Sequence, residues 1–139
     1  MVTTAVPVNP FSMKDVSLVL GPTEAGYEFR TSVSSVQFTP SASTVTWSGL
    51  GLNTYTDVNT ATWVCTLEYA QDWDAPESLS AFLYENEGAT VPVVFKPKNA
   101  GAKTFTGEVI ITPGAVGGPV NAVAVASVTL GMPAKPVLA

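Results

Sequence analysis

The chain contains no histidine and only one cysteine, and these absences exclude much of enzyme chemistry. Among its 139 residues there is no histidine, the side chain that most often serves as general base, metal ligand or triad partner. Cys65 has no second cysteine for an intrachain disulfide, so nothing points to an oxidising compartment. A serine nucleophile would need a lysine base, and no Ser-x-x-Lys spacing is present. We therefore expect a protein that is not an enzyme and that uses no cofactor and no metal.

Charged residues are also scarce, and negative ones prevail. They make up 12% of the chain, with 6 Lys and Arg against 11 Asp and Glu and a net charge of −5. A surface that grips nucleic acid needs clustered Lys and Arg, which this composition argues against. No apolar run approaches the roughly 18 residues that span a bilayer, and no basic segment precedes a hydrophobic core at the N-terminus. We expect a soluble chain made in a cytosol, without membrane insertion.

The residues that are abundant favour a β-protein. Thr, Ser, Val, Gly and Pro replace the missing charges, and apolar residues reach 46%. A chain of this length most simply forms one domain, residues 1–139, with one core. Alternation of apolar and polar residues predicts strands along most of the chain. They are expected within 16–20, 27–38, 43–47, 62–69, 90–95, 105–112 and 120–130, with a bulge near 34–35 where the apolar parity shifts.

One helix interrupts this β pattern, at about residues 75–87. Asp74 is a suitable N-cap, Glu77 completes a capping-box-like pair, and Gly88 stands where a helix commonly stops. Three apolar side chains recur at helical spacing, namely Leu79, Phe82 and Leu83. The acidic group Asp72, Asp74 and Glu77 also has the residue types of a glycosidase pair or a cation site. A helix N-terminus, which favours negative charge, explains these carboxylates more simply.

Three segments carry apolar residues that the predicted sheets do not obviously cover. They are an uncharged N-terminal arm at about 1–13, a long loop at 48–59, and a C-terminal arm at about 131–139. Each either packs on the chain's own surface or contacts a neighbouring copy. The candidate self-assembly residues in these segments are Val6, Val8, Phe11, Leu50, Leu52, Tyr55, Val58, Pro133 and Val137.

Several short motifs along the chain are similar to those of one protein family. They are Phe38–Pro40, Thr46–Trp47, Thr62–Trp63, Leu67–Trp73, Ser78–Ser80, Phe82–Leu83, Glu87–Gly88, Val94–Lys98, Phe105–Gly107, Pro113–Gly114 and Ala124–Leu130. In these residues, which span roughly 15–135, the chain resembles the major tail proteins, or tail tube proteins, of long-tailed, siphovirus-type bacteriophages. None of the motifs is catalytic.

The resemblance implies a fold, an assembly and a location. The fold is mainly β, with two packed antiparallel sheets in a sandwich or barrel-like arrangement flanked by one short helix. Six copies form a ring, and rings stack into the tube that conducts DNA in the tail of the virion, after assembly in the host cytoplasm. Expected partners are other copies, tape measure protein, terminator and distal tail proteins, and DNA in passage. Carboxylates suit such a lumen because they repel DNA, and the candidates are Asp57, Glu68 and Glu108.

Two other classes of protein share the small size and β-rich composition. One is a capsid decoration or head-surface protein, which is also oligomeric. The other is an immunoglobulin-like adhesion or carbohydrate-binding module. Electron microscopy of the purified protein separates them, because tubes, capsid-bound trimers and monomers look different.

Overall fold

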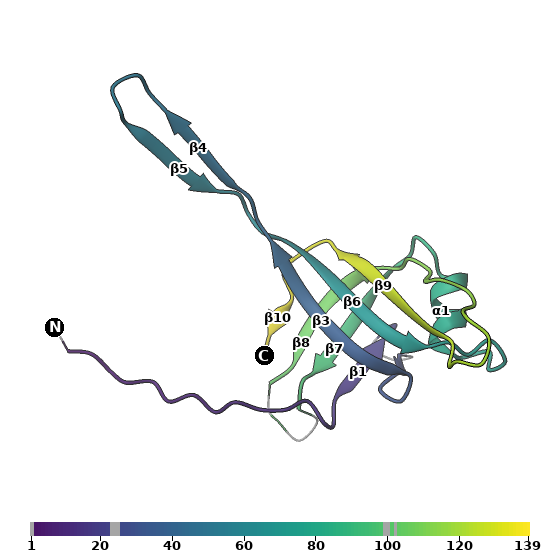
Figure 1. The fold of residues 1–139 in the computed structure, drawn as a ribbon. Helices are drawn as coiled ribbons and strands as arrows, with labels where there is room; N and C mark the ends of the chain where they lie inside the picture. The colour runs from purple at the N-terminus through teal and green to yellow at the C-terminus, as the bar shows by residue number, and fades with distance from the viewer. Residues whose placement is uncertain (1, 23–25, 99–100, 102) are drawn as a thin grey trace.

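The computed structural model describes residues 2–22, 26–98, 101 and 103–139, which form ten strands and one short helix (Figure 1). The strands are β1 (Ser17–Leu20), β2 (Tyr27–Glu28), β3 (Val33–Ser41), β4 (Thr44–Ser48), β5 (Thr54–Val58), β6 (Thr62–Ala70), β7 (Thr90–Lys96), β8 (Phe105–Ile110), β9 (Val125–Met132) and β10 (Val137–Leu138). The helix α1 covers Leu79–Glu85. The mainly β fold with one short helix that the sequence predicts is confirmed.

Eight of the strands form one antiparallel sheet, which folds over on itself. Its order is β2-β1-β7-β8-β9-β6-β3, with β10 paired to β8, while β4 and β5 form a separate two-stranded sheet. A single residue pair, Ile110 with Gly131, joins β8 to β9. The two halves on either side of this junction pack face to face, so that Phe38 of β3 lies 5.4 Å from Phe95 of β7 between ring centroids. The result is a sandwich built from one continuous sheet.

Strand β6 is the centre of one half and shows why the alternation in its sequence matters. It pairs with β3 on one side and with β9 on the other along nearly its whole length. Cys65, Leu67 and Tyr69 point into the core and are almost completely buried, whereas Glu68 lies on the outer face. The pairing of β3 with β6 shifts register between Val33 and Ser35, where the change of apolar parity predicts a bulge.

The helix is shorter than predicted and begins with a different cap. It starts after Ser78, whose hydroxyl accepts a hydrogen bond from the Ala81 N–H at 3.2 Å, so the prediction of Asp74 as N-cap and of a helix from 75 is wrong. The cause is Asp72, whose carboxylate accepts hydrogen bonds from the N–H groups of Asp74 and Ala75 and holds these residues in a turn. The predicted stop is confirmed, because Gly88 has a φ of +83°.

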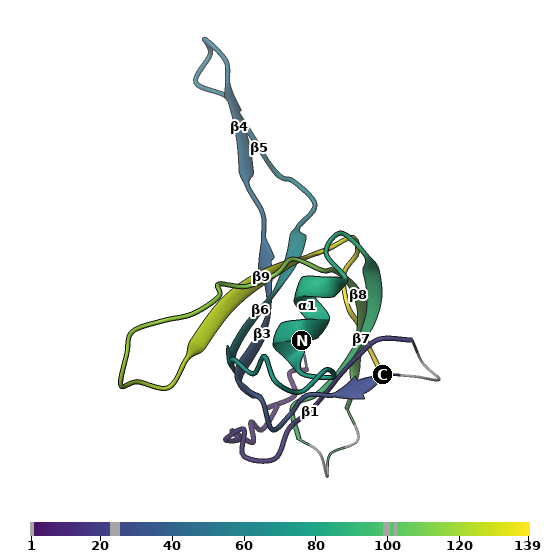
Figure 2. The ribbon, with the colours of Figure 1, turned by 90° about the vertical axis from the view of Figure 1, so that its right-hand side faces the viewer.

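The helix plugs one end of the folded sheet. Figure 2 looks onto this end and shows α1 lying between the half that contains β3, β6 and β9 and the half that contains β7 and β8. Leu79 and Leu83 face the core and are buried, as their spacing predicts. Phe82 of α1 and Phe29 lie 5.7 Å apart between ring centroids and close this end of the core.

Candidate assembly surfaces

The described residues form no cluster of side chains that could hold a metal ion. No group of three or more possible Cys, Asp or Glu ligands comes together among them. Burial raises the pKa of the Cys65 thiol from its ordinary value of 9.0 to about 12, so this thiol is not a nucleophile at neutral pH. Burial also raises the pKa of Tyr69, although a backbone hydrogen bond from Gly114 acts in the opposite direction. In the part of the chain that the structure describes, no helix is long and apolar enough to cross a membrane.

Residues 44–58 form a hairpin that projects far from the body of the protein (Figure 1). The sequence predicts a loop over 48–59, and this is wrong for Thr54–Val58, which pair as β5 with β4. Glycine and asparagine mark only the turn at 49–53, whereas the β-branched residues of 54–58 favour a strand. Every residue of both strands is exposed, so the hairpin contacts nothing on its own body that would cover it.

The two faces of the hairpin differ in chemistry. Val45, Trp47 and Tyr55 share one face, on which the Tyr55 hydroxyl donates a hydrogen bond to the Asp57 carboxylate at 3.2 Å. The opposite face consists mainly of threonine, with Val58 near the base. A two-stranded ribbon alone is marginally stable in water. The apolar face of this ribbon is left uncovered by the rest of the chain.

The turn of the hairpin presents two leucines to solvent. The Gly49 N–H donates to the Asn53 carbonyl at 2.8 Å and closes the turn. Leu50 is fully exposed, and Leu52 is 95% exposed. Leu52 also has a φ of +67°, a conformation that is unfavourable for a side chain of this size. The turn therefore holds two apolar side chains outward, into solvent.

The N-terminal arm extends away from the body in Figure 1. Val6 and Val8 in this segment are largely exposed. Contact with the body begins at Phe11, whose ring lies 5.2 Å from the ammonium nitrogen of Lys98. The arm thus presents the apolar side chains that the sequence identifies as assembly candidates, free of cover from the rest of this chain.

The C-terminal residues, by contrast, return to the body. Residues 131 and 132 belong to β9, and Val137 pairs with Thr106 of β8 in β10. The last residue, Ala139, exchanges two backbone hydrogen bonds with Thr104. Pro133 is exposed, and Val137 remains exposed on the outer side of the sheet. The segment expected as a second arm is therefore attached over its last residues, since β8 offers a free edge there.

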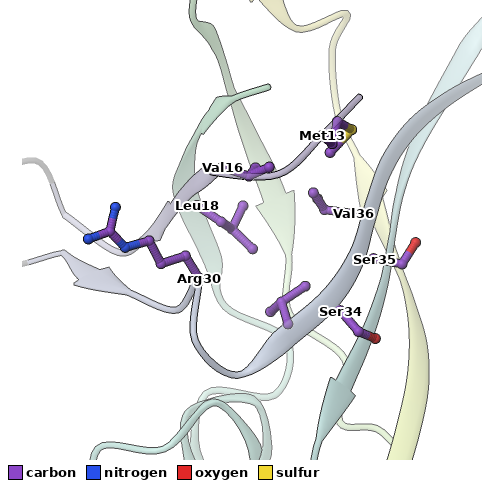
Figure 3. A pocket seen from close by; sticks show the side chains of 8 residues that line it. Met13, Val16, Leu18, Arg30, Ser34, Ser35 and Val36 are labelled. Carbon is purple, nitrogen blue, oxygen red and sulfur yellow. The ribbon is translucent and has the colours of Figure 1, made fainter. Parts of the chain in front are cut away.

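A small cavity marks the open seam between β1 and β3 (Figure 3). It has a volume of about 80 Å³ and lies between Met13, Val16 and Leu18 on one side and Val36 on the other. Arg30 lies at its margin and forms an ion pair with Asp15 at 3.6 Å. The lining is mainly aliphatic and includes no pair of groups suited to acid–base chemistry, so the seam is a packing feature beneath the start of the arm.

The three candidate lumen carboxylates lie on three separate surfaces. Glu68 lies on the outer face of β6, between Ser35 of β3 and Ser127 of β9. Glu108 lies on the outer face of β8, in the other half of the folded sheet. Asp57 lies on the hairpin beside Tyr55. Because the two halves pack by their inner faces, Glu68 and Glu108 point to opposite sides of the molecule.

A fourth apolar surface lies before β9 and was not identified from the sequence. The sequence predicts a strand from Val120, but β9 begins at Val125, and a glycine-rich connection precedes it. This connection projects beside β9 in Figure 2. Its exposed valines are Val116, Val120 and Val123, and Val125 at the start of β9 is exposed as well. In the sequence, these valines lie close to Gly114, Gly117 and Gly118, and a buried strand does not require such glycines. This combination was the signal for an exposed segment.

The helix end carries a groove of mixed aromatic and acidic character. It has a volume of about 520 Å³, and its residues come from the turn before α1, from α1 itself and from the connection before β9. Trp73 and Tyr84 form one wall, with their rings edge to face at 6.1 Å between centroids. Asp74, Glu85 and Val116 also line it.

No protein-family model matches the chain, and no curated protein matches its sequence. Among the solved structures that share its fold are two chains from gene transfer agent particles. A chain from the tail of an empty gene transfer agent particle, a tail with C6 symmetry, superposes with a TM-score of 0.67 at 14% identity, covering 94% of this chain and 99% of that one. A chain from the virion of a native gene transfer agent particle gives 0.56 at 15% identity, covering 88% and 95%. The chain therefore has the fold of a phage-like tail protein, as the sequence resemblance implies.

Proposed function

We propose that this protein is the tail tube protein of a phage-like particle, in which it has a structural and not an enzymatic role. The observation that supports this most is the fold likeness over 94% of the chain to a protein from a C6-symmetric tail. The exposed apolar hairpin supports it independently, because a monomer has no use for such a surface. Six copies form a ring, and stacked rings form the conduit for DNA. The particle's tail is the proposed location, with assembly in the cytoplasm of a bacterial host.

Ring closure in this proposal uses the free edges of the strand β3 and the strand β9. β3 is the last strand of the sheet and has nine residues, an edge long enough to pair with another copy. β9 is joined to β8 at Gly131 alone, so its Val125–Thr129 stretch offers a second edge. Pairing of β3 with β9 of the next copy would continue the sheet around a ring. The exposed valines before β9 lie beside this edge and would be covered by the neighbour.

The outer face of β3, β6 and β9 is suited to line the bore. Its residues are small or polar, and they include Ser35, Gln37, Thr66, Ser127 and Thr129. Glu68 is the one charged residue of this face. A surface without cations lets DNA slide without being held. Among the three candidate carboxylates we therefore assign the bore to Glu68, whereas Glu108 would face outward.

The hairpin and the N-terminal arm are the elements proposed to bridge rings. Both extend beyond the body, and both carry exposed apolar residues, among them Leu50, Leu52, Val6 and Val8. Rings at the two ends of the tube would contact terminator and distal tail proteins, and tape measure protein would occupy the bore during assembly.

Negative-stain electron microscopy of the purified protein tests the proposal. Six-fold rings, or tubes made of them, are expected at micromolar concentration. Trimers that attach to capsids would instead support a head decoration protein. A monomer that binds sugars would support an adhesion or carbohydrate-binding module. Either of these two outcomes would overturn the assignment to the tail tube.

A further inference from the structure

The body of the protein has two chemically different ends along the direction of β6. One, the hairpin end, holds the base of the hairpin, the last residues of β7 with Pro97, and the segment before β10. Trp63, Pro97 and Pro136 line one apolar groove there, which shows that these segments lie together. The other, the helix end, holds α1 and the connection before β9. There the N–H of Gln71, just after β6, donates to the Ala124 carbonyl of that connection. Nine residues of β6 separate the two ends.

The hairpin end carries most of the positive charge of the protein. Four of the 6 basic residues lie there, and they are Lys96, Lys98, Lys103 and Lys135. The remaining two are Lys14, in the N-terminal segment, and Arg30, which is paired with Asp15. No basic residue occurs between Arg30 and Lys96 in the sequence. In an acidic protein this segregation leaves one cationic end.

The helix end carries the opposite charge. Five exposed carboxylates lie within 16 residues of sequence and without a basic neighbour in that stretch, and they are Asp72, Asp74, Glu77, Glu85 and Glu87. Asp74 and Glu85 border the groove that Trp73 and Tyr84 line. The rings of Trp73 and Tyr84 are partly exposed, at 45% and 60% for the two residues. Aromatic faces flanked by carboxylates are the surroundings that an ammonium group prefers.

We propose that this groove is the docking site for the lysines of the hairpin end of a second copy, in the next ring of the stack. Lys98 and Lys103 of that copy are the residues that enter it. Their aliphatic stems cover Trp73 and Tyr84, and their ammonium groups pair with Asp74 and Glu85. This inference deepens the proposed function and rests on it.

A second copy is the partner because the two complementary surfaces lie on opposite ends of one chain. A contact between two different surfaces of identical subunits is heterologous, and it repeats without limit unless a rotation closes it. The edges of the sheet are used for closure of the ring, so the end-to-end contact is left to build the stack. The opposite charges of the two ends also fix the direction in which copies stack, because two helix ends or two hairpin ends would repel each other.

Reciprocal charge reversal tests the proposal. The first variant is Asp74→Lys with Glu85→Lys, the second is Lys98→Glu with Lys103→Glu, and the third combines all four substitutions. We expect each double variant to form rings but at least tenfold fewer tubes, counted by electron microscopy. The combined variant is expected to recover tubes to at least half of the unmodified level. Glu108→Lys, a reversal on the outer face of β8 that does not line the groove, serves as control and should leave tube number unchanged.

The outcomes separate this inference from the proposed function. Absence of rings from the unmodified protein would contradict the proposed function. Normal tubes from either double variant, or failure of the combined variant to recover them while rings persist, would overturn the docking site alone. Loss of rings in a double variant would place these charges in ring closure and would also overturn it. As a second measurement, tubes of the unmodified protein should dissociate into rings at about 1 M salt, where the screening length falls to about 3 Å.

Discussion

The contact between Tyr69 and Gly114 shows how strongly one missing side chain can matter in this fold. Tyr69 is buried at the end of β6, and its hydroxyl lies where a Cβ at position 114 would be placed. Since Gly114 has an ordinary negative φ, its role is to leave space and not to adopt a special backbone conformation. The close approach fastens the connection before β9 to the core.

We expect Gly114→Ala to lower the free energy of unfolding by about 1–3 kcal/mol, because the added methyl group overpacks a buried site. Denaturation in urea measures this change. Gly118→Ala is the matched control in the same connection, since nothing lies within 4 Å of a Cβ there. Its effect should stay within about 0.5 kcal/mol. Equal losses in both variants would show that the clash with Tyr69 is not the cause.

Cys65 should be inert in the folded protein. Burial raises its pKa to about 12, so we expect no reaction with a disulfide reagent at pH 8 and full reaction after denaturation. The folded-state pKa of the Cys65 thiol lies above the unfolded value. The stability linked to this thiol is therefore fully present below pH 9 and is lost between about pH 9 and pH 12. The unmodified protein should therefore lose stability over that range more steeply than Cys65→Ala, measured by thermal unfolding. Fast labelling at pH 8 would contradict the buried position.

At the scale of elements, the hairpin and the helix show what the sequence can and cannot predict. Apolar candidates at 50, 52, 55 and 58 were identified because exposed apolar residues in a glycine-rich segment have no local explanation. Their arrangement in a two-stranded ribbon was not predicted, because β5 pairs with β4, whose residues lie outside the segment that the sequence marks as a loop. The helix face was predicted from its spacing, but its start was not. The Asp72 carboxylate holds the N–H groups of Asp74 and Ala75 in a turn, and Ser78 caps the helix instead by accepting from the Ala81 N–H.

The cap of α1 can be checked by two substitutions. Ser78→Ala should lower the free energy of unfolding by about 0.5–2 kcal/mol, because it removes the acceptor for the Ala81 N–H and the donor to the Asp72 carbonyl. Asp74→Ala should change it by less than about 0.5 kcal/mol, since Asp74 is an exposed turn residue. Guanidinium unfolding followed by circular dichroism distinguishes the two. The reverse order would restore Asp74 as the cap.

The hairpin tip should matter for assembly and not for folding. We expect Leu50→Ser with Leu52→Ser to leave the melting temperature within about 2 °C, because surface changes of this kind alter stability little. Rings should still form, whereas tubes should become at least tenfold rarer by electron microscopy. Thr46→Ser with Thr56→Ser, on the other face of the same hairpin, is the control. Tubes of normal number from the leucine variant would argue against a role of the tip in stacking.

For the whole molecule, the alternation along single strands was predictable and the architecture was not. Positions 63, 65, 67 and 69 share the buried face of β6 because burial in a sheet follows a period of two. The order of strands, and the folding of one sheet at the Ile110–Gly131 pair, depend on contacts between segments distant in sequence. The opposite placement of Glu68 and Glu108 follows from this folding, which explains why both remained candidates for one lumen.

The assignment of the bore to one face can be tested in an assembled particle. We expect Glu68→Lys to leave tube formation intact but to reduce genome delivery at least tenfold, because six lysines per ring would hold the DNA backbone. Infection or transfer frequency is the measurement, with particle number determined separately. Glu108→Lys should leave delivery unchanged, since it lies on the opposite side of the subunit. Normal delivery with lysine at 68 would place the bore elsewhere.

The slender hairpin also has a mechanical consequence. The body is a doubled sheet with a filled core, whereas the β4–β5 ribbon has two strands and nothing behind them. A tube whose rings are joined through such ribbons consists of stiff discs connected by compliant links. Bending is then concentrated between discs, and the bore keeps its diameter within each one. A tail built from this chain should curve without kinking.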